Sequence, residues 1–132
     1  MGVSSDLQRV IVARLKAAVP AVAGRVYGRR APEGATMPYI SIGNFAGYDD
    51  DLDCIISGRM IGQVDIFASA YPDDREASDI TDAVRRALRG WSDESVITMH
   101  PMRILMWDVS ADPDPTAIHG FVRIEAEVEE DG

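Results

Sequence analysis

The chain has 132 residues, of which 46% are hydrophobic and 27% charged, a composition typical of a packed globular protein. Its 13 basic and 22 acidic side chains give a formal net charge of −9, which repels phosphate backbones and argues against a general nucleic-acid binder. No repeat or low-complexity stretch interrupts the chain, so we predict one domain over residues 1–132, with an acidic tail from about residue 129.

A first amphipathic helix is predicted at the start of the chain. Ser5 and Gln8 have the spacing of a capping box. The apolar residues that follow recur at helical intervals, at Leu7, Val10, Ile11, Leu15 and Ala18. The helix is expected to end near residues 20–24, where proline and glycine occur.

Three strands are predicted in the next third of the chain, at residues 26–27, 39–45 and about 58–69. The third strand points Met60, Val64, Ile66 and Ala68 to one side and Ile61, Gln63, Asp65 and Phe67 to the other. Because this second face mixes apolar and polar residues, part of it is expected to be in contact with another surface and not with solvent. The acidic segment at residues 47–53 is interpreted as a loop between the second and third strands.

A second helix and two further strands complete the predicted order. Asp73 and Glu76 suggest a capping box, and a buried stripe follows at Ala77, Ile80, Val84, Ala87 and Leu88, with Gly90 as the stop and Trp91 folding back onto the core. Strands are predicted at about residues 102–109 and 120–128. The expected fold class is α+β, an antiparallel or mixed sheet of four to five strands with two helices packed on one face.

Residues that could support catalysis or metal binding are few. His100 and His119 each precede a predicted strand, and if those strands pair, the two could approach each other and bind a divalent metal with Asp108, Asp112 or Asp114. Their spacing matches no metal signature, and no nucleotide or nucleophile motif occurs. We therefore predict no catalytic residues, no metal and no cofactor. Asp65 and Arg123 are expected to form a cross-strand ion pair.

The cysteine count and the short apolar runs indicate the cellular compartment in which the protein works. Cys54 is the single cysteine, so an intrachain disulfide, a zinc ribbon and a redox CxxC are all excluded. The apolar runs are far shorter than the roughly 20 residues of a membrane span, and the first residues lack a secretory pattern. We expect a protein that is made and used in a cytoplasm, without membrane contact.

Charged residues supply the candidate docking surfaces. Two acidic loops are expected to lie on exposed surfaces, one with Asp49, Asp50, Asp51 and Asp53, the other with Asp112 and Asp114. Arg29 and Arg30 lie in a turn-rich loop and could clamp a phosphate or a carboxylate of a partner. For each of these segments the plain alternative is a solvated turn or tail.

Three stretches of the chain, in order, resemble the tail-completion, or tail-terminator, family of long-tailed bacteriophages, prophages and gene transfer agents. They are GRVY, APEGATMPYI and SIG at residues 24–27, 31–40 and 41–43; QVDIFA and ASDITDAVRRAL at 63–68 and 77–88; and DPD and HGFVRI at 112–114 and 119–124. No piece is a sharp motif alone, so the order carries the likeness. Phe67 stands where family members often have tryptophan.

The resemblance implies a structural role without catalysis. Members form a ring, usually of six subunits, that caps the finished tail tube and offers the surface to which the head connector joins. The implied partners are further copies of the chain, the tail tube protein and the head-completion or connector protein, with DNA passing through the ring unbound. The implied location is the virion tail or neck. The alternatives are a head-closure or other neck component and, from other classes, a ferredoxin-like small-molecule sensor or a metal enzyme at the two histidines.

Overall fold

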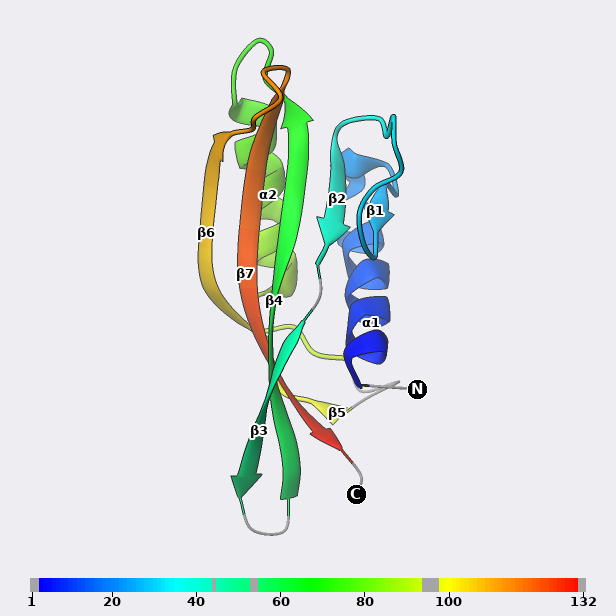
Figure 1. Cartoon of the computed structure of the whole chain (residues 1–132), viewed down its shortest axis with the longest axis vertical. Helices are drawn as coiled ribbons and strands as arrows, with labels where there is room; N and C mark the ends of the chain where they lie inside the picture. The colour runs from blue at the N-terminus through cyan, green and yellow to red at the C-terminus, as the bar shows by residue number, and fades with distance from the viewer. Residues whose placement is uncertain (1–2, 44, 53–54, 94–97, 131–132) are drawn as a thin grey trace.

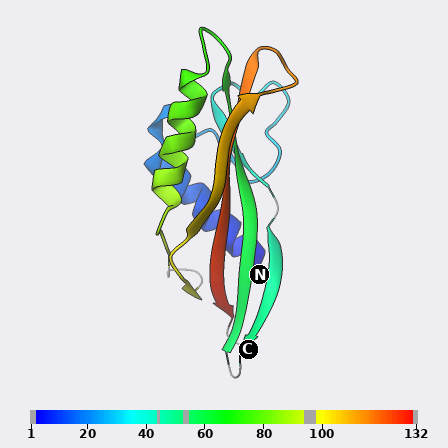
Figure 2. The same cartoon turned by 90° about the vertical axis from the view of Figure 1, so that its left-hand side faces the viewer.

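The computed structural model of the chain describes residues 3–43, 45–52, 55–93 and 98–130. A twisted mixed sheet carries two α-helices on one face (Figures 1 and 2). The elements follow in the order α1 (Val3–Ala18), the 3-10 turn η1 (Pro20–Val22), β1 (Val26–Tyr27), β2 (Tyr39–Ile42), β3 (Ala46–Leu52), β4 (Ile55–Ser69), α2 (Arg75–Leu88), β5 (Thr98–Met99), β6 (Arg103–Ala111) and β7 (Ala117–Glu130). The α+β class and the placement of both helices on one face are confirmed.

The centre of the sheet is the antiparallel pair β4 and β7. Their register runs from Ile56 opposite Glu130 to Ser69 opposite Ala117. Each strand is long enough to hold two shorter partners, so β2 and β3 pair with opposite ends of β4, while β6 and β5 pair with opposite ends of β7. Among the described strands, only the two-residue strand β1 is parallel to its neighbour, β2, which makes the sheet mixed.

The sheet in the described part of the chain has seven strands, more than the four to five expected. The two additions are β5 and β3. The acidic segment that we predicted as a loop forms β3, which pairs with β4 from Ala46 opposite Ile61 to Leu52 opposite Ile55. Pairing along this whole length satisfies the backbone groups of the acidic segment that face β4, and this outweighs the low strand preference of aspartate.

Both predicted capping boxes are wrong in detail. The first helix already begins at Val3, so Ser5 lies inside it, and the side-chain amide of Gln8 donates to the carbonyl of Gly28 instead of reaching back to the helix start. The second helix is capped by Asp74, without a side-chain hydrogen bond. Asp73 accepts from the backbone N–H of Arg75 (3.0 Å). Gly90 has φ of 72°, which suits its predicted role as the helix stop.

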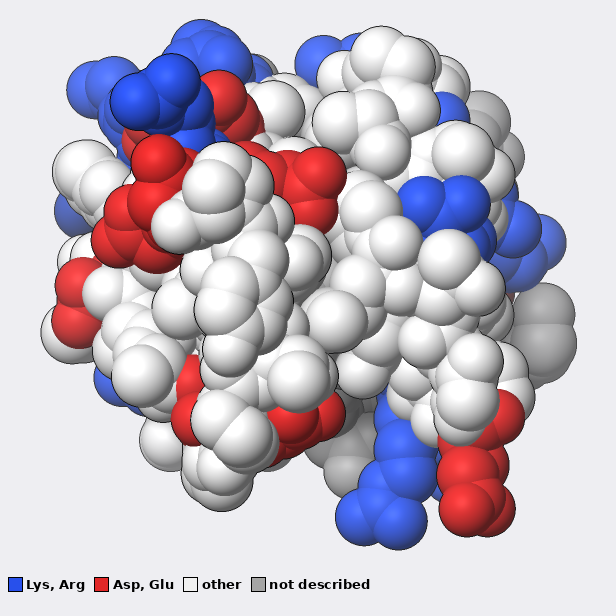
Figure 3. All heavy atoms as spheres, turned by 90° about the horizontal axis from the view of Figure 1, so that it is seen from above, with Lys and Arg blue, Asp and Glu red and all other residues white. Residues whose placement is uncertain are grey.

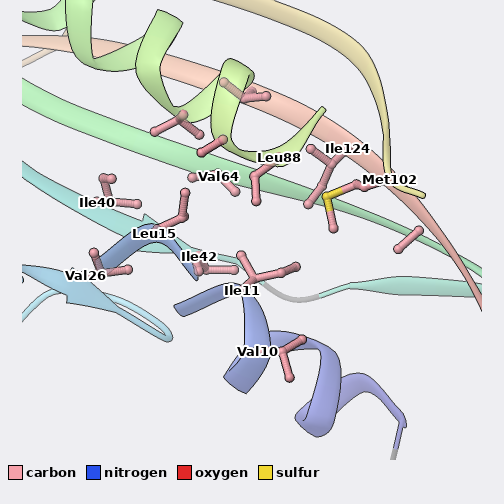
Figure 4. Close-up of a cluster of buried hydrophobic side chains, with 14 of the residues drawn as sticks. Val10, Ile11, Leu15, Val26, Ile40, Ile42, Val64, Leu88, Met102 and Ile124 are labelled. Carbon is pink, nitrogen blue, oxygen red and sulfur yellow. The ribbon is translucent and has the colours of Figure 1, made fainter. Parts of the chain in front are cut away.

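The core lies between the helices and the sheet (Figure 4). The stripe predicted on α2 is buried, and so are the helix-facing residues of β4 and β7, which confirms the predicted alternation of both strands. In Figure 4, Ile11 and Leu15 of α1 approach Ile40 and Ile42 of β2. Trp91 packs against this core, as predicted, under the guanidinium of Arg14 at 5.7 Å from the ring centroid.

Candidate functional site

The sheet face away from the helices carries a row of rings that crosses four strands. We call Tyr27, Tyr39, Phe67, His119 and Phe121 the aromatic band. Neighbouring ring centroids are 5.9, 5.2, 4.7 and 6.4 Å apart in that order, and the Phe67 and His119 rings are nearly parallel, at 3°. All five side chains are half-buried. The mixed second face predicted for β4 is therefore part of a larger apolar strip.

A chain of polar contacts runs beside the aromatic band. Asp65 Oδ1 lies 2.7 Å from His119 Nε2 and accepts from Gln63 Nε2 at 2.7 Å, and Arg123 donates to Gln63 Oε1 at 3.1 Å. The predicted ion pair between Asp65 and Arg123 is wrong, because Arg123 stands opposite Gln63 and Asp65 stands opposite Phe121. Gln63 bridges the two charged groups instead, and His119 is the direct partner of the carboxylate.

The two histidines do not form a joint site. His100 Nε2 lies 3.0 Å from Glu129 Oε1, at the opposite end of β7 from His119. Ten positions of strand separate residues 119 and 129, which corresponds to about 33 Å. The expectation that the two histidines could approach each other is therefore wrong, and no cluster of three metal-ligating side chains occurs among the described residues.

Arg29 and Arg30 lie beside α1, along an open hollow of about 550 Å³. Arg9 and Lys16 of α1 line the same hollow, so four basic side chains surround it, and we call this surface the basic hollow. Both loop arginines are exposed, whereas Arg9 is paired with Asp6 at 2.8 Å. The hollow is thus a positively charged surface on a chain whose net charge is −9.

Asp112 and Asp114 build the turn between β6 and β7. Asp112 accepts from the backbone N–H of Asp114 (3.0 Å), and Asp114 accepts from the backbone N–H and the hydroxyl of Thr116 (2.9 and 2.7 Å). The bonds from Thr116 lower the pKa of Asp114 below the ordinary carboxyl value. Burial, then the charge of Asp112 and then Tyr27, raise the pKa of Tyr39 above its ordinary value. Asp112 is therefore close enough to Tyr39 of the aromatic band for its charge to act on the phenol.

The remaining predicted residues belong to β3, apart from Asp53. Asp49, Asp50 and Asp51 stand opposite Gly58, Ser57 and Ile56 of β4, and Asp53 lies outside the described residues. The β3–β4 hairpin projects at one end of the molecule, and the Asp112–Asp114 turn lies at the other (Figure 1). The structure thus places the described candidate residues in three separate parts of the molecule: the basic hollow, β3 and the β6–β7 turn.

The view from above shows how charge is distributed at the end that carries the β6–β7 turn. Basic and acidic atoms lie side by side at several places near the rim, and much of the middle is uncharged (Figure 3). Sequence reasoning missed the aromatic band, although phenylalanines at outward positions of β4 and β7 were a signal for it. It also missed Arg9 and Lys16, because a cationic surface shared by a helix and a distant loop leaves no local pattern.

A run of exposed apolar side chains on β6 was missed as well. Leu105, Met106 and Trp107 are 43, 47 and 48% exposed. The register of β6 against β7 shifts between Ile104 and Met106, so Leu105 has no residue directly opposite it. Such a bulge cannot be read from alternation, because it changes the face to which the following residues point.

A protein family model and a solved structure both match nearly the whole chain. The family model described as Tail completion protein gp17 matches residues 9–129. A chain from a solved structure described as "Virion of native gene transfer agent (GTA) particle" superposes with a TM-score of 0.83 at 20% sequence identity, covering 98% of each chain. At that identity the likeness shows a shared fold. No curated protein matches the sequence, and no helix in the described part of the chain is long and apolar enough to cross a membrane.

Proposed function

The chain belongs to the tail completion protein gp17 family, and from this premise we propose that it closes into a ring of six copies that terminates a tail tube. The ring would offer the surface to which the head connector joins. The observation that carries the proposal is the family match over residues 9–129, nearly the whole chain. The particle would be a phage, a prophage product or a gene transfer agent. No reaction is assigned to the chain.

Three structural features support a ring subunit. The sheet has unlike free edges on its two sides, which suits a head-to-tail contact. Charged surfaces of both signs lie on different parts of the molecule, so one protein could contact unlike neighbours above and below the ring. The overall charge of −9 would let DNA pass through the lumen without adhering.

The candidate residues receive distinct roles in this proposal. The aspartates of the β3 segment and the Asp112–Asp114 turn would face the channel or an adjoining ring, and Arg29 and Arg30 would dock an acidic partner. The partners are further copies of the chain, the tail tube protein and the head-completion or connector protein. The protein would assemble in the host cytoplasm and remain in the tail or neck of the virion.

A tube-capping experiment tests the function. Purified protein is mixed with tail tubes and with growing tube protein, and the products are examined by electron microscopy and light scattering. We expect a ring of six 14.4 kDa copies, 86.4 kDa in all, at tube ends, and no further growth of capped tubes. Tubes that continue to elongate at the same rate, with bare ends, would refute the proposal.

A variant pair tests the basic hollow separately. Arg29→Ala with Arg30→Ala removes two exposed charges, and each exposed charge contributes little to folding, so the fold is expected to be unchanged. We expect weaker binding to the tube or the connector. Arg75→Ala, which removes an exposed arginine outside the hollow, is the matched control. If both variants bind the tube and the connector as strongly as the unmodified protein does, the basic hollow is not part of the docking surface.

A further inference from the structure

The free edge of β6 differs from an ordinary protein surface. β6 pairs with β7 along one side, and no described strand pairs along the other. In Figure 2, where this edge faces the viewer, β6 runs in front of the sheet and no other element covers it. Soluble proteins usually protect such an edge with charges, prolines or a covering element. Here the middle of the strand instead presents Leu105, Met106 and Trp107, each more than 40% exposed.

The exposed apolar residues are concentrated on two strands. Among the side chains whose burial the structure describes, the exposed large hydrophobic ones are Tyr48, Tyr71, Leu105, Met106 and Trp107. All but Tyr71 lie on β3 or β6. These two strands are also unpaired edges on opposite sides of the β4–β7 pair. Three of these residues lie on β6, and β3 contributes Tyr48, whose ring has the Arg59 guanidinium 5.3 Å from its centroid. Free backbone hydrogen-bonding groups occur at both strands, as at sites where a strand of another chain is added.

The charges at the two edges are opposite. A hollow of about 400 Å³ beside β6 is lined by Arg85, Arg89 and Arg103 together with Trp107. The Arg85 guanidinium lies 4.5 Å from the centroid of the Trp107 ring and is paired with Asp82 at 3.6 Å, so the basic character of this edge comes mainly from Arg89 and Arg103. β3, in contrast, has the sequence AGYDDDL, with three consecutive aspartates. A basic edge and an acidic edge on one molecule attract in a head-to-tail arrangement, whereas two identical edges repel each other.

From these observations we propose that β6 of one copy pairs with β3 of the next copy, so that the sheet continues across the subunit boundary. The inference rests on the proposed ring and specifies its interface. Each step from β3 through β4 and β7 to β6 reverses the strand direction. β3 and β6 are therefore antiparallel to each other, and the new pair would be antiparallel as well.

The stagger of the two edges fits a closed ring. β3 lies beside residues 55–61 of β4, and β6 lies beside residues of β7 that pair with residues 61–68 of β4. The centres are about 6.5 residues apart along the strands, or about 21 Å. Four strand spacings separate equivalent strands of adjacent copies, about 19 Å. If β6 of one copy overlaps the full length of β3 of the next, these two distances require the strands to tilt by about 48° from the ring axis. A slightly shorter overlap of β6 with β3 brings the tilt into the 35–45° range of closed barrels.

Two variants that each block one edge test the interface. Leu105→Glu with Met106→Glu places negative charge on the β6 edge, at side chains that are already exposed, so that this edge repels the acidic β3. Asp49→Lys, Asp50→Lys and Asp51→Lys reverse the charge of β3. Tyr71→Lys, at an exposed apolar residue outside both edges, is the matched control. Circular dichroism and thermal melting establish that each variant is folded.

Sedimentation velocity, with and without tail tubes, gives the readout. The unmodified protein and the Tyr71→Lys control should form rings, whereas each blocked variant should stay monomeric, with association weakened at least tenfold. An equimolar mixture of the two blocked variants should form rings again, because each contact then joins edges of opposite charge. Mixed rings would not form if the contact joined identical edges.

The outcomes separate the two proposals. If the unmodified protein forms rings and both blocked variants form them equally well, the interface is wrong and the ring stands. If the unmodified protein stays monomeric even with tail tubes, both proposals fail. Dimers formed by one blocked variant alone would overturn the head-to-tail contact. If a blocked variant does not fold, cysteines at Met106 and Asp50 in a Cys54→Ser chain give the same answer, because a short bismaleimide should link copies only when both cysteines are present.

Discussion

Substituting Gly120 by alanine should push α2 away from the sheet. Gly120 is buried on β7, on the face that α2 covers, opposite Ile66 of β4 and Val109 of β6. A Cβ atom at this position would lie 2.1 Å from the hydroxyl oxygen of Thr81. Thr81 is 1% exposed, and its hydroxyl has no hydrogen-bond partner among the described residues. The contact therefore forces movement of a packed helix side chain.

The size of the effect follows from two opposing contributions. Alanine restricts the unfolded chain more than glycine does, which favours folding by about 0.5–1 kcal/mol. An ordinary contact would need about 1.3 Å more separation, and overpacking of this kind costs roughly 1–3 kcal/mol. We expect a net loss of about 1–2 kcal/mol in the free energy of unfolding, or roughly 3–10 °C in Tm for a chain of this length.

Thr81→Ala supplies the control, because it removes the oxygen that the new methyl group would meet. Urea unfolding of the two single variants and the double variant, at one protein concentration, gives a double-mutant cycle. The double variant should be more stable than the sum of the single effects predicts, by about 1 kcal/mol or more. The reasoning is refuted if Gly120→Ala unfolds at the same urea concentration as the unmodified protein, or if the two effects simply add.

Three further predictions concern α1, the aromatic band and the acidic turn. Leu15→Ala, at a residue with 0% exposure, should cost about 2–5 kcal/mol by urea unfolding, and a cost below 1 kcal/mol would contradict the packing of α1. His119→Ala should cost about 1–3 kcal/mol because it loses the bond to Asp65 and the stack on Phe67; His119→Phe should recover part of this, and equal losses would contradict the stacking role. The lowered pKa of Asp114 means that its contribution to stability is complete above the ordinary carboxyl pKa and is lost as the pH falls through the lowered value. Asp114→Asn should therefore flatten the decline of Tm below about pH 4, and an unchanged decline would contradict the assigned bonds.

Periodicity predicted the elements that face the core. The stripes of α1 and α2 and the alternation of β4 and β7 are all decided by burial of one face against the other layer, so each leaves a repeat in the sequence. The helix starts were harder to predict. A capping pattern shows which side chains could bond to the first backbone N–H groups, but such a side chain can also bond elsewhere in the fold. Gln8, for example, bonds to the carbonyl of Gly28, twenty residues away.

The candidate site was only partly accessible to sequence reasoning. Charged runs drew attention to the β3 segment and the Asp112–Asp114 turn, but the basic hollow and the aromatic band draw on residues that are distant in the chain. Packing of α1 beside the loop brings the residues of the hollow together, and strand register, which depends on the whole sheet, brings the rings of the band together. The same limit explains why Asp65 was assigned to Arg123: the two strands were identified correctly, but their relative alignment by two residues was not.

The misreading of β3 bears directly on assembly. Consecutive aspartates argue against a strand because aspartate is depleted in sheets, yet charges are also how proteins keep an exposed edge from pairing with copies of itself. An acidic edge would admit only a partner edge of opposite charge, and the arginines beside β6 supply one. Raising the salt concentration from about 0.05 to 0.5 M should therefore weaken association of the unmodified protein, because screening shortens the range of this attraction. Association that is unchanged or stronger at high salt would show that the apolar residues of β6 act without help from charge.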